Sequence, residues 1–512
     1  MSAAAAPDVA IQAPLRDSVL AGCYFGTRHH DGAAGLAAFL VDDPPDALRR
    51  WFGDERATAL LGLDPDALRG AIDRDIAAID ALLSAQVDAI LHHPRLRRLE
   101  GSWRGLAWLM GGLEPGSRVK VRLLSITWAE ICRDLERAIE FDQSTLFRLI
   151  YEGEFGMPGG EPFGLLVVDH EVRHRPSAQA PTDDVAALAS LSSIAAAAFS
   201  VIALSVSPAL LGADDFADLA IASDPASPLR QATHDRWRTL GGRDDSRFLC
   251  VLMPRVLARR PWDDDPGRRD GFRYAEYAPD AACRVWMTAG YAFAAVVMRA
   301  FALHAWPADI RGVDTDRDGG GVVGDLPVEW FDTDPPGVWA RPPLDLVLTD
   351  GQERTLVDGG LIPLISLPYT VDAAFASVTS LHQPRRFAGA TSAAANANAR
   401  LSAQINAILC AARFAHYIKV MGRDMVGSLQ TAERIQQRLQ TWLREYVNAA
   451  VDAGPEVRAR KPLSDGRVTV HEYPGRPGVF GCVLHLKPHF QLDEVAAEFD
   501  LRTNIAAPAQ AR

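Results

Sequence analysis

Apolar residues recur at intervals of three and four positions in a stretch that begins near residue 68. These residues are Leu68, Ile72, Ile76, Ile79, Leu83, Val87 and Ile90. Because an α-helix makes one turn in about 3.6 residues, this spacing places them on one stripe of a long helix. Asp64 and Pro65 mark its predicted start, and Pro94 follows its predicted end.

Strand-like and helical patterns then alternate along the chain. Residues 119–123 alternate between apolar and basic side chains, which predicts a strand. Thr127 and Glu130 have the spacing of a capping box, which predicts the start of a helix. The buried side of that helix is predicted to carry Ile131, Leu135 and Ile139. The further elements predicted are strands at 165–168, 248–253 and 344–348 and a helix at 286–303. Such alternation indicates a mixed α/β core.

One uncharged stretch resembles a membrane span. Residues 185–213 contain no charged side chain, and their number exceeds the roughly 20 residues that a spanning helix needs. The stretch nevertheless contains several serines and Pro208, and it changes from Ala-rich to β-branched near Phe199. We therefore predict a buried helix followed by a buried strand, and no insertion into a membrane.

The last third of the chain has a different pattern. Residues 393–420 predict one helix, and a second begins near Thr431. A hairpin is predicted from the strands 467–473 and 479–487, and a last strand from 495–501. Together with the preceding pattern, this predicts an α/β (mixed α+β) fold whose C-terminal region is helical and then β-rich.

Three regions follow from these patterns. Residues 1–66 are rich in Ala, Gly and Pro and predict an N-terminal arm. Residues 67–376 predict an α/β domain, and residues 385–505 predict a C-terminal domain with two helices, a hairpin and a terminal strand.

Composition excludes several classes of protein. The net charge is −12, with 65 acidic and 53 basic residues, which argues against a nucleic-acid-binding protein. The six cysteines are far apart and form no CxxC pair, so neither a disulfide framework nor a structural zinc site is expected. The N-terminus lacks the pattern of a signal peptide, and we expect a cytoplasmic protein.

Residues 170–174 spell HExxH, the motif in which two histidines on one helical face bind zinc and a glutamate acts as base. Here the motif directly follows the predicted strand 165–168 and precedes Pro176, which leaves no room for the helix. We expect no metal site, and we retain a zinc-dependent hydrolase using His170, Glu171 and His174 as an alternative.

Residues 314–325 begin like a calcium-binding loop. Asp314, Asp316, Asp318 and Asp325 stand at the first, third, fifth and twelfth positions, where calcium requires oxygen ligands. The twelfth residue is Asp instead of the usual bidentate Glu. We expect a solvated loop and no bound cofactor, with a calcium-regulated adaptor as the alternative.

A series of longer motifs occurs in a fixed order between about residues 70 and 500. They include His93-Pro94, Leu99-Glu100, Ser102-Trp103-Arg104-Gly105-Leu106, Glu140-Phe141-Asp142-Gln143-Ser144, Pro158 to Gly164, Asn398 to Gln404, Arg413 to Tyr417 and Lys487 to Leu492. This series resembles the large subunits of the type VI secretion contractile sheath (the TssC/VipB family). Residues 1–66 and the Asp-rich loop depart from the family pattern, so a divergent sheath paralogue with an accessory role remains an alternative.

The resemblance implies a structural protein without enzymatic activity and a contractile-tail-sheath-like core. It implies co-assembly with a small sheath subunit and with other copies of this chain, around an inner tube of hexameric rings. A baseplate and a disassembly ATPase are further implied partners.

Family members link protomers by adding strands to a neighbour's sheet, and the β-rich end of this chain offers such strands. The residues predicted to take part are Val468, Val470, Phe480, Val483, Leu484, Leu486, Val495, Phe499 and Leu501.

Overall fold

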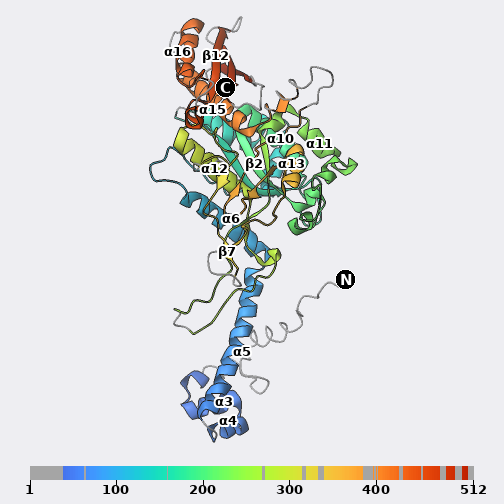
Figure 1. Ribbon diagram of the computed structural model, residues 1–512, viewed down its shortest axis with the longest axis vertical. Coiled ribbons are helices and arrows are strands. Elements are labelled where there is room, and N and C mark those ends of the chain that lie inside the picture. The colour runs from blue at the N-terminus through green and yellow to red at the C-terminus, as the bar shows by residue number, and fades with distance from the viewer. Residues whose placement is uncertain are drawn as a thin grey trace. The chain divides into compact units, whose positions relative to one another are not determined.

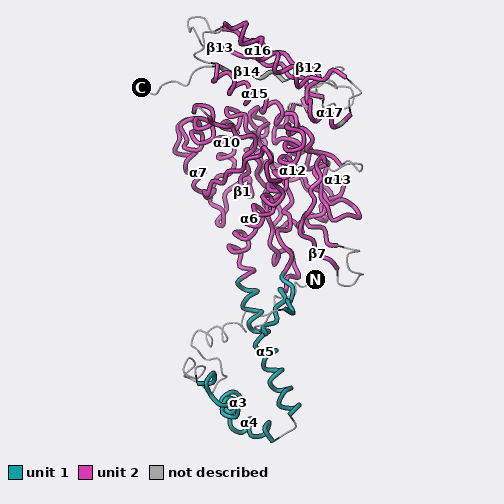
Figure 2. Tube along the Cα trace, turned by 90° about the vertical axis from the view of Figure 1, so that its left-hand side faces the viewer, with its two compact units in different colours: residues 1–90, 262–276 teal, residues 91–261, 277–512 magenta. Residues whose placement is uncertain are grey.

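The computed structural model (Figure 1) describes residues 38–62, 65–157, 159–267, 271–313, 319–331, 340–384, 396, 399–400, 402–425, 431–450, 454–472, 480–489 and 499–505. The chain divides into two compact units, which Figure 2 shows in different colours. Unit 1 comprises residues 1–90 and 262–276, and unit 2 comprises residues 91–261 and 277–512.

Unit 1 contains the long helix predicted from the apolar stripe. Its helices are α3 Pro44–Phe52, α4 Asp54–Leu61 and α5 Pro65–Leu91. The indole N–H of Trp51 donates a 2.8 Å hydrogen bond to Asp75 of α5, and Ala57 and Ala71 are buried. Trp51 thus joins α3 to the N-terminal half of α5, and the Tyr274 hydroxyl donates a 2.7 Å hydrogen bond to Asp88 in its C-terminal half.

Parallel strands form the centre of unit 2. They are β1 Leu165–Val172, β2 Val201–Val206, β3 Leu249–Met253 and β9 Ile362–Pro363, in the order β1-β2-β3-β9. All six residues of β2 are buried, and alternate residues point to opposite faces of the sheet. Helices α10 Asp184–Ala198 and α12 Ala289–His304 pack against β2 (Figure 1). The sheet is therefore covered on both faces, as parallel sheets usually are.

The uncharged stretch forms α10 and β2, as predicted. Within the described ranges, no helix is both long enough and apolar enough to cross a membrane.

The C-terminal part of unit 2 contains α15 Ile405–Met425, α16 Ala432–Arg444 and α17 Pro455–Arg460. It also contains the antiparallel strands β12 Leu463–Glu472, β13 Phe480–Pro488 and β14 Phe499–Ile505. Trp306, just after α12, stacks on Phe414 of α15, and Tyr446 lies edge-on to both rings. This aromatic cluster joins the C-terminal helices to the α/β core.

Unit 2 also contains further helices and several two-residue strands. The helices are α6 Pro94–Gly111, α7 Trp128–Arg137, α8 Thr145–Phe147, α9 Gly153–Phe155, α11 Asp235–Gly241 and α13 Asp350–Asp358. The strands are β4 Val256–Leu257, β5 Trp286–Met287, β6 Val322–Val323, β7 Glu329–Trp330, β8 Ala340–Arg341, β10 Ile365–Ser366 and β11 Ala373–Ala374.

Several sequence predictions were wrong. Residues 119–123 form no strand in the part of the chain that the structure describes, and residues 344–348 contribute only one bridge, between Leu344 and Val256. Ile139 lies beyond the end of α7 and is 90% exposed. A segment with an alternating pattern forms a strand only where another strand lies beside it and completes the ladder of hydrogen bonds. The sequence of the segment itself does not specify that partner strand.

Candidate assembly interface

The residues predicted to link protomers belong to the sheet β12-β13-β14. Four of them are buried: Val468, Val470, Leu484 and Leu486. These side chains stabilise the sheet within the chain, since α16 packs against β12. Phe480 and Val483 are half-buried. The structure describes only the backbone at Phe499 and Leu501 of β14, and Val495 lies outside the described residues.

Glutamine side chains from α16 occupy the outer edge of β12. The Gln440 side-chain oxygen accepts a 2.8 Å hydrogen bond from the N–H of Val468, and the Gln436 oxygen accepts one of 3.0 Å from Val470. The Gln440 amide nitrogen donates to the carbonyl of Gly466 at 3.0 Å. These amides take the place that backbone groups of a fourth strand would occupy, so this edge is already satisfied.

The other edge of the sheet belongs to β14. The Val468 N–H points toward α16, so Val468 makes no backbone hydrogen bond to β13. The residues on either side of Val468 make those hydrogen bonds instead. Val468 lies opposite Leu484 of β13, and Leu484 lies opposite Leu501 of β14, so the direction of each backbone N–H in β14 follows from that in β12. The N–H of Leu501 therefore faces β13, and the N–H groups of Asp500 and Arg502 face outward. No strand of the described part pairs along that side of β14, although helix α15 packs against this strand.

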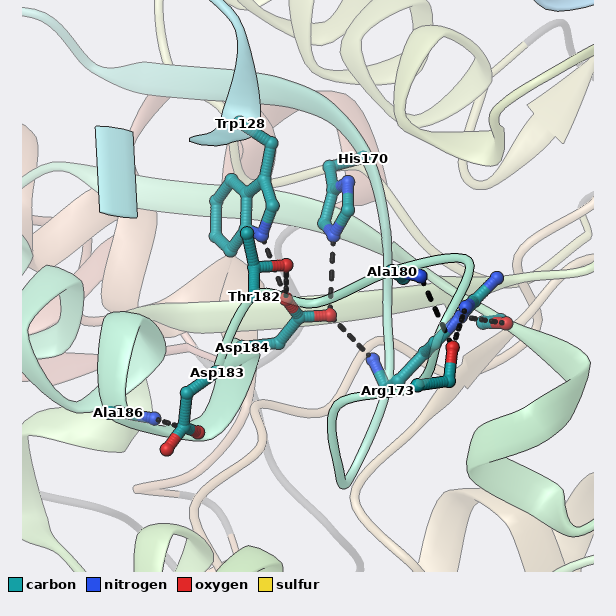
Figure 3. Close-up of polar contacts among 10 residues, drawn as sticks. Trp128, His170, Arg173, Ala180, Thr182, Asp183, Asp184 and Ala186 are labelled. Carbon is teal, nitrogen blue, oxygen red and sulfur yellow. Dashed lines mark hydrogen bonds and ion pairs between the residues drawn. The ribbon is translucent and has the colours of Figure 1, made fainter. Parts of the chain in front are cut away.

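The HExxH residues lie mostly on β1 instead of on a helix. The His170 ring stacks on Trp128 with centroids 4.3 Å apart, and its Nε2 lies 3.2 Å from Asp184 Oδ2 (Figure 3). The same carboxylate oxygen accepts the backbone N–H of Arg173 at 2.9 Å. Burial opposes ionisation of Asp184, but the hydrogen bonds from His170 and Trp128 outweigh it and keep its pKa below the usual value.

The other two motif residues have different partners. Glu171 accepts a 2.6 Å hydrogen bond from Arg255, which also lies 3.2 Å from the fully buried Asp345. Burial raises the pKa of Asp345 to about 6 despite the nearby Arg255. The His174 ring stacks on His234 at 3.9 Å. The two motif histidines thus face different neighbours, and Glu171 serves in an ion pair, so the constellation does not form a zinc site.

The loop that begins like a calcium-binding loop was predicted to be solvated and without calcium, and Asp314, Asp316 and Asp318 lie outside the described residues. At its far end, the carbonyl of Asp325 accepts a 2.9 Å hydrogen bond from the indole of Trp108. Elsewhere in the described ranges, no group of three or more His, Cys, Asp or Glu side chains is placed to hold a metal ion.

The sequence analysis did not predict the role of Gln436 and Gln440, whose side chains hydrogen-bond to the backbone along the outer edge of β12. The available signal was a pair of glutamines four residues apart on a helix that precedes a strand. That spacing places both amides on one helix face, but only the folded arrangement shows that this face lies along β12.

Comparison with known proteins gives consistent matches over most of the chain. The family model described as EvpB/VC_A0108, tail sheath N-terminal domain, matches residues 73–382. The model described as EvpB/VC_A0108, tail sheath gpW/gp25-like domain, matches residues 394–505. The type VI secretion system sheath protein TssC1 of Pseudomonas aeruginosa is 33% identical over 451 residues, which cover 87% of this chain and 88% of that protein.

Proposed function

This chain belongs to the TssC/VipB family of type VI secretion sheath large subunits, and from that premise we propose that it polymerises with a small sheath subunit into a contractile sheath. The chain is a structural sheath protein and not an enzyme. In the proposal, it surrounds an inner tube of hexameric rings in the cytoplasm, anchored at a baseplate. Contraction drives the tube outward, and a separate ATPase then disassembles the contracted sheath.

The observation that carries this proposal is the asymmetry of the C-terminal sheet. Side chains of α16 close one edge, at β12, while β14 turns backbone groups such as the Arg502 N–H outward. An edge strand without a partner strand favours uncontrolled association in a lone protein, but in a polymer it can pair with a neighbour's strand. If β14 is the linking edge, each copy has one direction of linkage.

The arrangement requires no chemistry for its work. Subunits joined by strands can rotate as rigid bodies while their main-chain hydrogen bonds remain intact. For this function we propose that residues 67–376 form the sheath's N-terminal domain and residues 385–505 its C-terminal linking domain.

Electron microscopy of the full chain co-expressed with the small sheath subunit from the same gene cluster tests the proposal. We expect hollow, cogwheel-ended tubules. If both proteins are folded but remain discrete particles, the contractile role is wrong, and the chain is a divergent paralogue with an accessory role.

A further inference from the structure

Three aromatic rings surround the side chain of one lysine on α15. The ammonium nitrogen of Lys419 lies 4.8 Å from the ring centroids of Tyr151 and Phe155 and 4.9 Å from that of Phe199. It also donates a 3.3 Å hydrogen bond to the Tyr151 hydroxyl. Because the faces of aromatic rings attract cations, these three residues form an aromatic cage around Lys419.

The backbone that holds the cage has two uncommon conformations. Residues Arg148–Glu152, which include Tyr151, form a π-helix. Phe199 directly follows α10 and has a φ of 51°, a left-handed conformation that glycine usually adopts at the end of a helix. Uncommon backbone conformations of this kind are frequent at functional sites, so the amine inside the cage is a candidate for a function.

The ammonium group of Lys419 has no acidic partner among the described residues. The carboxylate of Glu154, next to Phe155 in the chain, pairs instead with Arg122 and accepts the N–H of Glu161 at 2.8 Å. The Lys419 side chain is half-buried, and burial lowers its pKa to about 8. The attraction of the rings for the cation opposes this shift. At pH 7.5, up to roughly a quarter of the amine is therefore uncharged, against about 0.1% for an ordinary lysine.

The type of basic residue in the cage is also informative. Four of the 53 basic residues of the chain are lysines, and the others are arginines. At another cation–π contact on α15 the cation is Arg413, which lies 4.5 Å from the ring centroid of Tyr417. Arginine is the more frequent partner of aromatic rings and stays charged, whereas lysine can lose its proton and act as a nucleophile. The cage thus holds the basic side chain that can be modified at nitrogen.

We infer that Lys419 is a site of N-acylation, with acyl phosphates and acyl thioesters as the class of donor. The ammonium first loses a proton to water, and the uncharged Nζ then attacks the carbonyl carbon of the donor. A C–N bond forms while the C–O bond to phosphate or the C–S bond to the thiol breaks. The phosphate or thiolate leaves with the electron pair of the broken bond, and a second proton passes from nitrogen to water.

Acylation would change the packing of α15. The amide product is uncharged, so the cage loses the cation that attracts Tyr151, Phe155 and Phe199 to this helix. The same helix carries Phe414, which stacks on Trp306 in the aromatic cluster beside the α/β core. We therefore expect acylation to destabilise the chain. This inference concerns the single chain and does not depend on the sheath function.

Acetylation of the purified, full-length chain with isotope-labelled acetyl phosphate tests the inference. Mass spectrometry of chymotryptic peptides measures the rate at each lysine over a range of pH. Lys461, which is exposed, serves as the internal reference. We expect Lys419 to react at least about fivefold faster than Lys461 at pH 7.5, and its rate to level off above about pH 8. A rate no higher than that of Lys461, or one that rises in parallel with it to high pH, would overturn the inference.

Two substitutions test the effect on packing. Lys419→Gln resembles the acetylated side chain, and Lys419→Arg is the matched control, because it keeps the positive charge inside the cage. Thermal melts followed by circular dichroism should show a lower melting temperature for Lys419→Gln than for Lys419→Arg. Equal melting temperatures would show that the charge does not hold α15 in place, and would overturn the expected destabilisation.

Discussion

At the scale of single residues, the guanidinium group of Arg255 forms ion pairs with two carboxylates. It lies 2.6 Å from Glu171 and 3.2 Å from Asp345, whose side chain is fully buried. Burial works against charge on Arg255, yet hydrogen bonding to Glu171 raises its pKa. We expect Arg255→Met to lower the free energy of unfolding by about 3–5 kcal/mol, because it leaves the buried Asp345 without a counter-charge. Urea denaturation followed by circular dichroism measures this loss.

An exposed ion pair supplies the control for Arg255→Met. Arg236 lies 2.7 Å from Asp183, but its side chain is 59% exposed, so solvent screens the interaction. Arg236→Met should cost less than about 1 kcal/mol. Equal losses from the two variants would show that the Arg255 cluster behaves like any surface pair.

A buried histidine makes stability depend on pH. His416 lies in α15, its Nε2 is 3.0 Å from the carbonyl of Ala198, and burial lowers its pKa from 6.5 to about 3. The unfolded chain therefore binds this proton more readily than the folded chain between those values. The free energy of unfolding should fall as the pH drops below about 6.5.

The comparison of variants isolates this contribution of His416. Urea unfolding at several pH values should show a shallower acid dependence for His416→Gln than for the wild type. His485→Gln, at an exposed position of β13, should keep the wild-type slope. An unchanged slope in His416→Gln would show that this residue does not contribute to acid unfolding.

Single-residue roles could be predicted from the sequence only where the neighbourhood is local. His416 has the aromatic neighbours Phe414 and Tyr417 in its own helix, a pattern that indicates a packed histidine, and its side chain is buried. The partners of His170 could not be predicted, because Trp128 and Asp184 lie on separate elements that meet only in the folded chain. A five-residue motif specifies the residue types, but it does not specify the direction in which each side chain points in the folded chain.

At the scale of elements, the packing of α6 gives a sharp prediction. Gly101→Ala should lower the free energy of unfolding by about 1–3 kcal/mol, since the added methyl group meets the Trp286 backbone and either strains it or moves the helix. Gly111→Ala, at the end of the same helix, has nothing within 4 Å and should be neutral or slightly stabilising. Thermal melts of both variants provide the measurement, and similar melting temperatures would contradict the close approach.

Elements with their own internal signals were predicted well. The apolar stripe fixed the existence of α5, and Thr127 with Glu130 forms the predicted capping box at the start of α7. Boundaries were less accurate, because the predicted helix 286–303 begins at Ala289, after the short strand β5. Residues 119–123 have a strand-like pattern, but pairing depends on a distant partner, which no local pattern specifies.

At the scale of the whole molecule, the sequence predicted the order of the main helices and strands. It did not predict which edge of the C-terminal sheet is hydrogen-bonded by side chains. The strands of the C-terminal sheet follow from their alternating residues and from the turn between them. Which edge stays available depends on α16 folding back along β12, where Gln436 and Gln440 pair with its backbone. The side chains that the pattern predicted to link protomers, such as Val468 and Leu484, are buried within the chain. The backbone of β14 is therefore the better candidate for contact with a neighbour.

A proline in β14 tests this placement, because proline has no N–H to donate. The Arg502 N–H faces away from β13, so Arg502→Pro removes a group from the outer edge and leaves the ladder to β13 intact. We expect the purified chain to fold with a melting temperature close to that of the wild type. Co-expressed with the small subunit, it should form few or no tubules, whereas Arg502→Ala, which keeps the N–H, should assemble normally. Normal tubules from Arg502→Pro would mean that neighbours do not add strands at β14, and the linkage would then have to use side-chain surfaces.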